Sequence, residues 1–406
     1  MKKLILFIAV VFSIKDVSAC TLYWADGNNR ILCAKNMDWS NPESRMLFIP
    51  SSDGKYGRVY FGIQSAAGFT NTSGMNEMGL WYGGASLPER KNIYNTYNKP
   101  RWEYELIEKV MEECATVDEA IEIFKKYWEP HWNGHTLIAD KYGNYVVIEY
   151  GDHDVEFLHN NKKYQVMTNF YLIDSINSRW YNCYRYNVAK TMLENSQDIS
   201  FHLFRNIAEA THAKGKFQTV LTTIHDVRSG DIQLYHMHNF HEFLTINLFK
   251  ELEKGEHYLK CSDYFSKIKI QEAEIAHDKV KLVWTGESDS YLIQYSKYPD
   301  FREQTAINYT GLKKSYDKST LSSGIFFVIL VYSFALRKKK ISLSLILSLF
   351  ILILSCQKID IEPQFSKRHH EINITGLEPQ TTYYWKICSM NIEYTTNSII
   401  SSFKTL

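Results

Sequence analysis

Hydrophobic and polar residues alternate along several short stretches of this chain, which is the pattern of strands that bury one face. The alternation begins in residues 21–24 and returns in residues 30–34, with a polar turn at residues 26–29 between them. Two alternating stretches around a short polar turn predict a β-hairpin. Further strands are predicted over residues 57–63, 137–139, 145–150, 219–225 and 232–238.

Helical spacing of apolar residues appears between these strands. Leu106, Ile107 and Val110 fall on one face of a helix, and the run from Thr116 to Glu119 is a capping box. The order of strands, helices, strands, helices and strands is typical of an α+β fold with antiparallel sheets and is compatible with an αββα sandwich. The helices are predicted over residues 102–114, 117–127, 180–193 and 200–213.

The chain begins with the three parts of a secretory signal peptide. Two lysines come first, an apolar stretch covers residues 4–12, and small residues occupy positions 17–19. We therefore expect residues 1–19 to be removed on export. Cleavage after Ala19 makes Cys20 the first residue of the exported chain.

A second apolar region, residues 321–356, predicts a membrane hairpin. Its halves, 321–336 and 341–356, are each about one turn short of the roughly 20 residues that span a bilayer, and they flank the basic residues 337–340. The positive-inside rule places the basic turn in the cytoplasm and both flanks outside. We expect a periplasmic or cell-surface protein anchored in the membrane. A buried helical hairpin, or a second lipoprotein signal ending at residues 353–356, is the alternative interpretation.

Alternation returns beyond residue 279 and again near the C-terminus. Residues 372–379 contain Gly-Leu-Glu-Pro and are followed by Thr-Tyr-Tyr-Trp at 382–385, which resembles the late strands of a fibronectin type III module. The segments 279–315 and 360–406 would form the two parts of that module. The membrane region separates them, so either the hairpin is inserted into one module or the two segments are separate.

Composition narrows the classes of function. The chain of 406 residues is 45% hydrophobic and 22% charged, which indicates a packed globular protein. A net charge of +1 gives no electrostatic reason to expect a nucleic-acid partner. The seven cysteines include no CxxC pair, so zinc-ribbon and thioredoxin chemistry have no support. We interpret Cys33, Cys114, Cys183 and Cys261 as buried small apolar residues.

A free Cys20 would carry a thiol and an α-amine on one residue. An α-amine has a pKa of about 7.7–8.0, so roughly a tenth of it is neutral at pH 7 and able to accept the thiol proton. Such a nucleophile requires no separate histidine, no cofactor and no metal. Residues 17–20 are also an acceptable lipobox, and lipidation of Cys20 would block both groups.

These residues resemble the choloylglycine hydrolase family, which includes bile salt hydrolases, penicillin V acylases and other linear-amide hydrolases. Cys20-Thr21 is followed by Ala-Lys-Asn-Met-Asp-Trp at 34–39, and Asn-Glu-Met-Gly-Leu lies within 74–80. Thr-Asn closes residues 166–169, and Arg-Tyr-Asn-Val-Ala occupies 185–189. The resemblance implies an αββα N-terminal-nucleophile (Ntn) hydrolase domain over residues 20–262.

The resemblance also implies catalytic roles. Cys20 would be the nucleophile, Asp38 would hold its α-amine, and Asn169 would donate its side-chain amide to the oxyanion. Arg185 would stabilise the catalytic cluster and the thiolate. Lys35 stands where the family usually has arginine, and it keeps the charge without the planar fork.

Ser86 and Asn76 are the candidate substrate-binding residues. Ser86 falls where bile salt hydrolases have asparagine and penicillin acylases have tyrosine, so neither substrate is assigned. Arg179 is an alternative to Arg185 for the basic role. Asp38 by itself is also typical of a turn or cap. His135, which flanks a predicted turn, is interpreted as a surface or core-edge residue.

The sequence thus predicts an exported hydrolase of linear amides that acts through an acyl-thioester on a small N-acyl amide. An acyltransferase on the same fold is one alternative, in which an amine replaces water in the second step. A surface lipoprotein or ligand-binding protein without catalysis is the other. The oligomeric state stays open.

Overall fold

The computed structural model describes most of the chain after the predicted signal peptide. The predictions for residues 1–19, 321–356 and Arg179 lie outside the described residues. Within the described residues, no helix combines the length and apolar character needed to cross a bilayer. The described ranges are 20–88, 99–129, 134–151, 154–177, 183–265, 267–271, 273–288, 290–310, 368–390, 395–398 and 400–406.

The chain forms two compact units. The first contains Met1–Lys269 together with Lys386–Ser401, and the second contains Ile270–Trp385 together with Ser402–Leu406. A short segment near the C-terminus therefore belongs to the same unit as the N-terminal half of the chain. The two units are described separately below.

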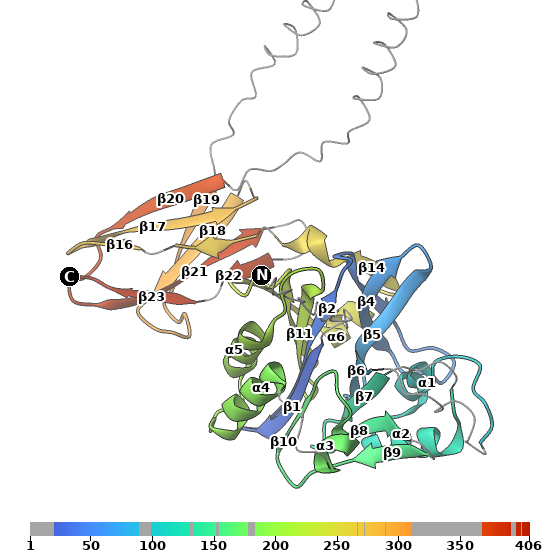
Figure 1. Cartoon of the computed structure of the whole chain (residues 1–406). Coiled ribbons are helices and arrows are strands. Elements are labelled where there is room, and N and C mark those ends of the chain that lie inside the picture. The colour runs from blue at the N-terminus through green and yellow to red at the C-terminus, as the bar shows by residue number, and fades with distance from the viewer. Residues whose placement is uncertain are drawn as a thin grey trace, which may run out of the picture. The chain divides into compact units, whose positions relative to one another are not determined.

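One sheet of the first unit begins with the predicted hairpin. β1 and β2 pair with Gly27 opposite Arg30, and the turn residues Asn28 and Asn29 have φ of 53° and 59°. Asparagine tolerates this left-handed conformation, so the prediction is confirmed. All pairings are antiparallel (Figure 1). The order is β10 (Tyr164–Met167), β1 (Thr21–Gly27), β2 (Arg30–Trp39), β11 (Gln218–Asp226), β12 (Asp231–His236), β13 (Glu242–Asn247) and β22 (Thr395–Ser398).

The other sheet of the first unit has eight antiparallel strands. β8 has the predicted bounds, and the predicted strand at 137–139 extends back to Gly134. The order is β14 (His257–Lys260), β3 (Ser44–Ile49), β4 (Arg58–Ser65), β5 (Gly68–Asn76), β6 (Trp81–Ser86), β7 (Gly134–Ala139), β8 (Tyr145–Tyr150) and β9 (Val155–Leu158).

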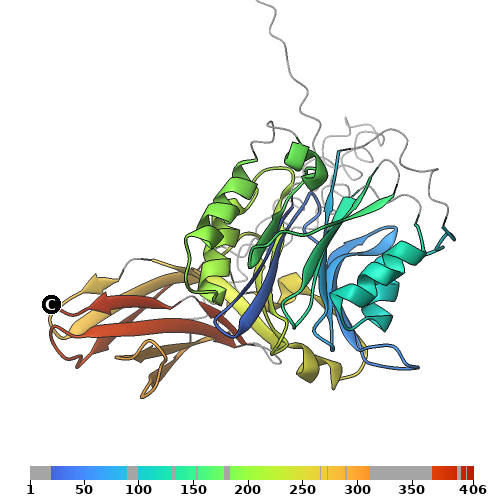
Figure 2. The ribbon, with the colours of Figure 1, turned by 90° about the horizontal axis from the view of Figure 1, so that it is seen from below.

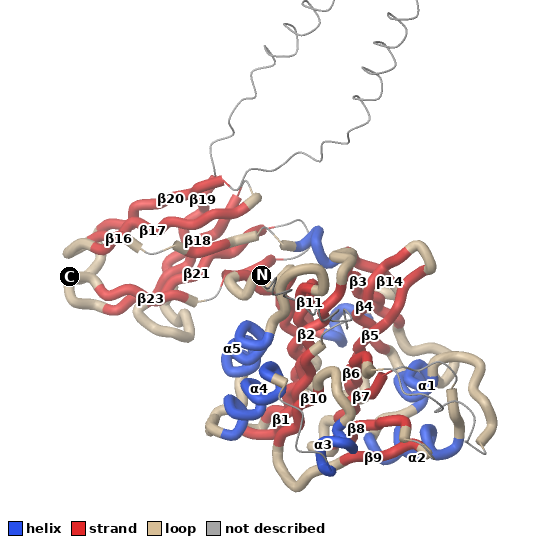
Figure 3. The backbone as a smooth tube through the Cα atoms, in the orientation of Figure 1, coloured by secondary structure: helices blue, strands red, loops and turns tan. Residues whose placement is uncertain are grey.

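Helices cover the outer faces of these two sheets (Figures 2 and 3). The alternation in β1 explains the layers, because Leu22 and Trp24 are buried between the sheets while Tyr23 and Ala25 are buried against the helices. α1 and α2 pack on the second sheet, and α4 and α5 pack on the first. The first unit is therefore the predicted αββα sandwich. The helices are α1 (Leu106–Glu113), α2 (Val117–Lys126), α3 (Leu172–Asn177), α4 (Tyr184–Glu194), α5 (Phe201–Thr211) and α6 (Leu248–Leu252).

Local signals fixed some boundaries and missed others. The capping box at Thr116 and Glu119 is present at the start of α2, as predicted. α1 begins later than predicted, since Trp102 instead donates its backbone N–H to the Trp128 carbonyl at 2.7 Å. β12 ends at His236, two residues before the predicted end, because the next two residues have positive φ.

In the second unit, segments on the two sides of residues 311–367 share a sheet. β17 (Lys279–Gly286) pairs antiparallel with β20 (Arg368–Thr375) from end to end. The alternative of two separate β segments is therefore wrong. The buried rings of Trp284 and His370 stack on each other, and Tyr291 meets both of them edge-on. The fibronectin type III assignment stays a prediction. The remaining elements of the described chain are a 3₁₀ turn of the first unit (Cys261–Tyr264), the strands β16 (Glu274–Ile275), β18 (Ser290–Ser296) and β19 (Thr305–Thr310) of the second unit, and three strands that cross the boundary between the units, β15 (Lys269–Ile270), β21 (Thr382–Met390) and β23 (Ser401–Lys404).

Candidate active site

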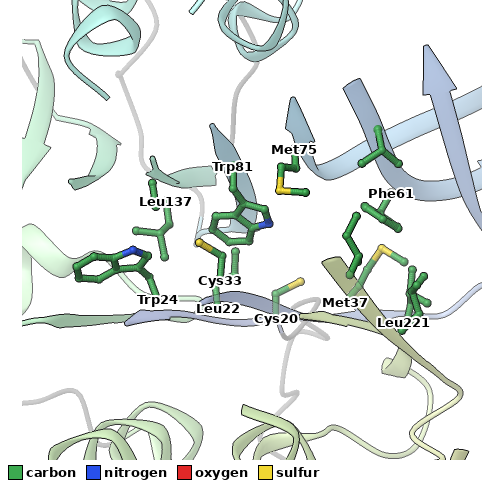
Figure 4. Packing of buried hydrophobic residues seen from close by; sticks show 14 of the residues in the cluster. Cys20, Leu22, Trp24, Cys33, Met37, Phe61, Met75, Trp81, Leu137 and Leu221 are labelled. Carbon is green, nitrogen blue, oxygen red and sulfur yellow. The ribbon is translucent and has the colours of Figure 1, made fainter. Parts of the chain in front are cut away.

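Cys20 lies at the entrance to β1, and its side chain points into the space between the two sheets. In Figure 4 the sulfur projects from the first sheet on the same side as Leu22 and Met37, facing Trp81 of the second sheet. Cys20 is buried, and it lines a cavity of about 230 Å³ between the layers. Other residues that line this cavity are Lys35, Met37, Trp39, Asn71, Thr72, Ser86, Glu105, Glu129 and Thr136.

A hydrogen-bond network joins four of the predicted site residues. The backbone N–H of Cys20 donates to Asn169 Oδ1 at 2.7 Å, and Arg185 Nη2 donates to the same oxygen at 3.1 Å. Arg185 Nη1 also donates to the Cys20 carbonyl and to Thr21 Oγ1. Asn169 Nδ2 donates to the Ser86 carbonyl at 2.8 Å. Residues from β1, β6, α4 and the segment after β10 therefore meet at Cys20.

Lys35 is a buried cation inside the sandwich. It lies on β2, lines the cavity, and donates from Nζ to the Thr72 carbonyl at 2.7 Å. Burial lowers the pKa of Lys35 to about 8, against the opposing effects of the Cys20 thiol and the Asp38 carboxylate. Burial also raises the pKa of the Cys20 thiol, and the Lys35 charge is the strongest influence that lowers it. Lys35 is therefore placed to stabilise a thiolate.

Asp38 lies inside β2 and is fully buried, so the turn or cap interpretation of this residue is wrong. Its carboxylate accepts a hydrogen bond from the Thr219 hydroxyl. Thr21 pairs with Asn36, so β2 carries Asp38 past the N-terminal side of Cys20. Burial raises the pKa of Asp38 to about 7, although Thr219 and nearby cations oppose the shift. A buried carboxyl group near Cys20 suits the predicted contact with an α-amine.

The structure places Asn76, a predicted substrate-binding residue, outside this cavity. Asn76 is buried and does not line the cavity. Its Nδ2 donates to the carbonyls of Met111 and Cys114 at 3.1 and 2.8 Å, and its Oδ1 accepts from the backbone of Met78 and Leu80. Asn76 thus ties the β5–β6 turn to the end of α1, which is a structural position.

His135 and Glu149 form a buried pair that the sequence analysis missed. His135 is fully buried within β7, so its interpretation as a surface or core-edge residue is wrong. Its Nδ1 lies 2.7 Å from Glu149 Oε1, and its Nε2 lies 2.5 Å from the carbonyl of Thr168. The sequence did contain a signal for this pair. If the predicted hairpin places Ala139 opposite Tyr145, the same register continued along both strands places residue 135 opposite residue 149.

Two carboxylates line the cavity without any signal in the sequence. Burial raises the pKa of Glu105 to about 7, with the charges of Glu108 and Glu129 adding to the shift. Glu129 accepts hydrogen bonds from the backbone of Leu106 and from the Tyr150 hydroxyl. Across the part of the chain that the structure describes, no group of three His, Cys, Asp or Glu residues is arranged to hold a metal ion.

Solved structures show the fold. The chain is similar to a conjugated bile acid hydrolase from Clostridium perfringens, with 18% identity, a TM-score of 0.50, and coverage of 59% of this chain and 97% of that one. A penicillin V acylase from Agrobacterium tumefaciens matches with 18% identity, a TM-score of 0.44, and coverage of 60% and 87%. The likeness to the bile acid hydrolase shows the fold, which is that of an Ntn hydrolase.

The family is shown by the sequence match. Residues 24–241, more than half of the chain, match the family model of acyl-coenzyme A:6-aminopenicillanic acid acyl-transferase, and the chain belongs to this family. The predicted Ntn-hydrolase membership is thus confirmed, and the fold and family support amide hydrolysis or acyl transfer. A 51-residue segment is also 47% identical to an acid phosphatase from Aspergillus ficuum, over 13% of this chain and only 8% of that protein.

Proposed function

We propose that this protein is an exported Ntn hydrolase that cleaves a linear amide C–N bond, with Cys20 as nucleophile once residues 1–19 are removed. One observation carries the proposal. The Cys20 nitrogen is held at 2.7 Å by Asn169 at a point where the Cys20 side chain lines a cavity. A nucleophile and its intended base are thereby fixed on one residue beside space for a substrate.

The first half of the reaction forms an acyl-thioester. The α-amine of Cys20 takes the thiol proton, and the sulfur attacks the carbonyl carbon of the substrate. The negative charge moves to the carbonyl oxygen. Asn169 has two N–H donors on Nδ2, of which one bonds to Ser86, so the second remains for this oxyanion. The C–N bond then breaks, and the proton held by the α-amine passes to the leaving amine.

The second half reverses the proton transfers. The α-amine takes a proton from water, the resulting hydroxide attacks the thioester carbonyl, and the C–S bond breaks to release the acid and restore the thiol. Lys35 favours the thiolate in both halves through its charge. Asp38 would hold the α-amine in position from β2.

An acyltransferase is the second candidate, because the matching family model is that of an acyl-transferase. The chemistry differs only in the molecule that attacks the thioester, an amine in place of water. Adding hydroxylamine to the reaction separates the two. Accumulation of a hydroxamate at the expense of the acid supports transfer, and a constant yield of acid supports hydrolysis.

Export and membrane attachment belong to the same proposal. The signal peptide at residues 1–19 supports export, and the apolar residues 321–356 support an anchor at the cell surface or in the periplasm. Mass spectrometry of the N-terminus of protein purified from cells tests the first step. A chain that begins with free Cys20 is expected, and a lipidated Cys20 would identify a lipoprotein without this mechanism.

The catalytic proposal is tested with protein that begins at Cys20. A panel of N-acyl amino acids, bile-salt conjugates and phenoxyacetyl amides is offered to the wild type, Cys20→Ala and Cys20→Ser. The wild type should cleave at least one substrate, and Cys20→Ala should lose more than about a thousandfold in kcat/KM. Equal behaviour of wild type and Cys20→Ala on a cleaved substrate would overturn the assignment.

A further inference from the structure

A buried pair of side chains, His135 and Glu149, holds the backbone on both sides of Asn169 without lining the cavity. The carbonyl of Thr168 can only accept a hydrogen bond, so His135 Nε2, 2.5 Å away, must carry a proton. His135 Nδ1 faces Glu149 Oε1 at 2.7 Å. The Glu149 carboxylate also accepts the backbone N–H of Leu172 at 2.8 Å and of Ile173 at 3.0 Å.

The hydrogen bonds join the two side chains to the backbone on opposite sides of Asn169. Glu149 Oε1 lies against both His135 Nδ1 and the Leu172 N–H, and Glu149 Oε2 accepts the Ile173 N–H. His135 Nε2 donates to the Thr168 carbonyl. Both side chains are fully buried, and they lie opposite each other on adjacent strands.

His135 and Glu149 form hydrogen bonds with the backbone on both sides of Asn169. His135 holds the carbonyl of Thr168, immediately before Asn169, and Glu149 holds the N–H groups that begin α3, three and four residues after it. β7 and β8 belong to the second sheet, whereas Asn169 follows β10 of the first sheet. The pair therefore anchors the Asn169 segment to the opposite sheet of the sandwich.

We propose that His135 and Glu149 are positioning residues, which set the place of the Asn169 amide relative to Cys20. This inference rests on the proposed function. His135 does not line the cavity, although its neighbours Gly134 and Thr136 do, so it acts through the backbone of Asn169. Because Asn169 touches both the Cys20 nitrogen and the Ser86 carbonyl, a small displacement of its backbone disturbs both contacts.

The expected kinetic effect falls on the chemical step. His135→Gln and the milder Glu149→Gln should lower kcat about 10- to 100-fold with little change in KM, the loss that a displacement of about 1 Å can cause. In an Asn169→Ala background the same substitutions should lower kcat less than about twofold, because the group that they position is gone. Alkylation of Cys20 by iodoacetamide needs no oxyanion donor, so its rate should fall much less than kcat does.

Asp140→Asn provides the matched control. Asp140 is equally buried in the turn between β7 and β8, and it accepts from the backbone of Val117 and Tyr142, away from the Asn169 segment. Its effect on kcat should be the same with and without Asn169→Ala. Equal losses from His135→Gln in the two backgrounds, or a rise in KM alone, would show a merely structural role.

Amide hydrogen exchange tests the same inference without a substrate. Each protein is measured at the same number of degrees below its own melting temperature. Exchange in residues 168–173 should accelerate in His135→Gln and Glu149→Gln and stay unchanged in Asp140→Asn. Unchanged exchange in all three would overturn the positioning role. If exchange accelerates in both variants but the wild type cleaves no amide, the contacts of His135 and Glu149 with the Asn169 segment are supported and only the proposed reaction is contradicted.

Discussion

At the scale of single residues, the site places charged groups where burial opposes their charge. Lys35 and Asp38 are both buried on β2 next to Cys20, and burial moves the pKa of each toward neutrality, to about 8 and about 7. Burial costs the charged forms several kcal/mol in general, so such groups persist where they serve a reaction. The raised pKa of Asp38 bears on the pH dependence of stability, and the charge of Lys35 bears on the reactivity of the Cys20 thiol.

Asp38→Asn should change how stability depends on pH. In the folded chain Asp38 has a pKa of about 7, above its ordinary value of 3.8, so the native state holds a proton that the unfolded state releases between these pH values. The stability contributed by this group is therefore full below about pH 4 and is lost as pH rises to about 7. Asp38→Asn should be more stable than wild type at pH 8 and similar at pH 4, as measured by chemical denaturation.

The control for Asp38→Asn is to repeat the stability measurement on two forms of the protein, one that keeps a residue before Cys20 and one that begins at Cys20. Wild type and Asp38→Asn are compared in the form that keeps a residue before Cys20, because a free α-ammonium group at Cys20 would stabilise the Asp38 carboxylate. Protein that begins at Cys20 should show a smaller loss of stability between pH 4 and pH 7. A stability difference that is the same at every pH would contradict the assignment of the shift to Asp38.

Lys35→Met should slow alkylation of the Cys20 thiol, whereas Lys35→Arg should preserve it. The Lys35 charge lowers the pKa of the thiol, and arginine keeps that charge. Without that charge the pKa of the thiol rises and less thiolate is present, so Lys35→Met should react several-fold more slowly at pH 7 than wild type. Iodoacetamide rates between pH 6 and 9 measure this. Equal rates for all three proteins would remove Lys35 from the activation of Cys20.

At the scale of elements, the proposed catalytic residues come from strands, helices and loops that are far apart in the sequence and meet through side-chain hydrogen bonds. Arg185 reaches Cys20 from α4, and Asn169 reaches it from the segment between β10 and α3. Asn76 does similar work away from the cavity, where it joins the β5–β6 turn to α1. Asn169 therefore acts at the proposed site and Asn76 acts on the stability of the fold, and kinetic and stability measurements distinguish the two roles.

Asn76→Ala should destabilise the protein without altering substrate binding. The substitution leaves two backbone carbonyls and two backbone N–H groups without their buried partner, at a cost of about 2–4 kcal/mol. Chemical denaturation measures the loss, and KM below the melting temperature should equal that of wild type. Ser86→Ala is the comparison within the cavity lining. A raised KM for Asn76→Ala at full stability would restore the substrate-binding role.

At the scale of the whole molecule, distant segments of the chain complete the unit that contains Cys20. β22 pairs antiparallel with β13 and covers the end of the first sheet that β13 would otherwise expose. The residues concerned, 395–398, follow β13 by about 150 positions. The unit that contains Cys20 therefore includes sequence beyond the predicted boundary at residue 262.

A chain that ends at residue 269 should be less stable and more prone to associate than the full chain. Removing β22 exposes the backbone of β13 as an open edge, which is a template for pairing with another molecule. Light scattering after gel filtration and thermal unfolding measure these two effects. A truncated chain that stays monomeric with an unchanged melting temperature would contradict this.

The sequence by itself determined the features that depend on near neighbours. The hairpin turn at Asn28 and Asn29 and the capping box at Thr116 follow from the backbone preferences of single residues, and the structure reproduces them. The grouping of Cys20, Asn169 and Arg185 was also predictable, from a family resemblance that carries information about spatial contacts.

Only the tertiary structure decided where buried polar groups lie. Nothing in the local pattern distinguishes Asn76, which braces a turn, from Asn169, which touches Cys20. The pairing of β17 with β20 across residues 311–367 likewise depends on contacts between remote segments. The physical reason is that periodicity records which face of an element is buried, whereas the partner on that face is chosen by packing among all the elements at once.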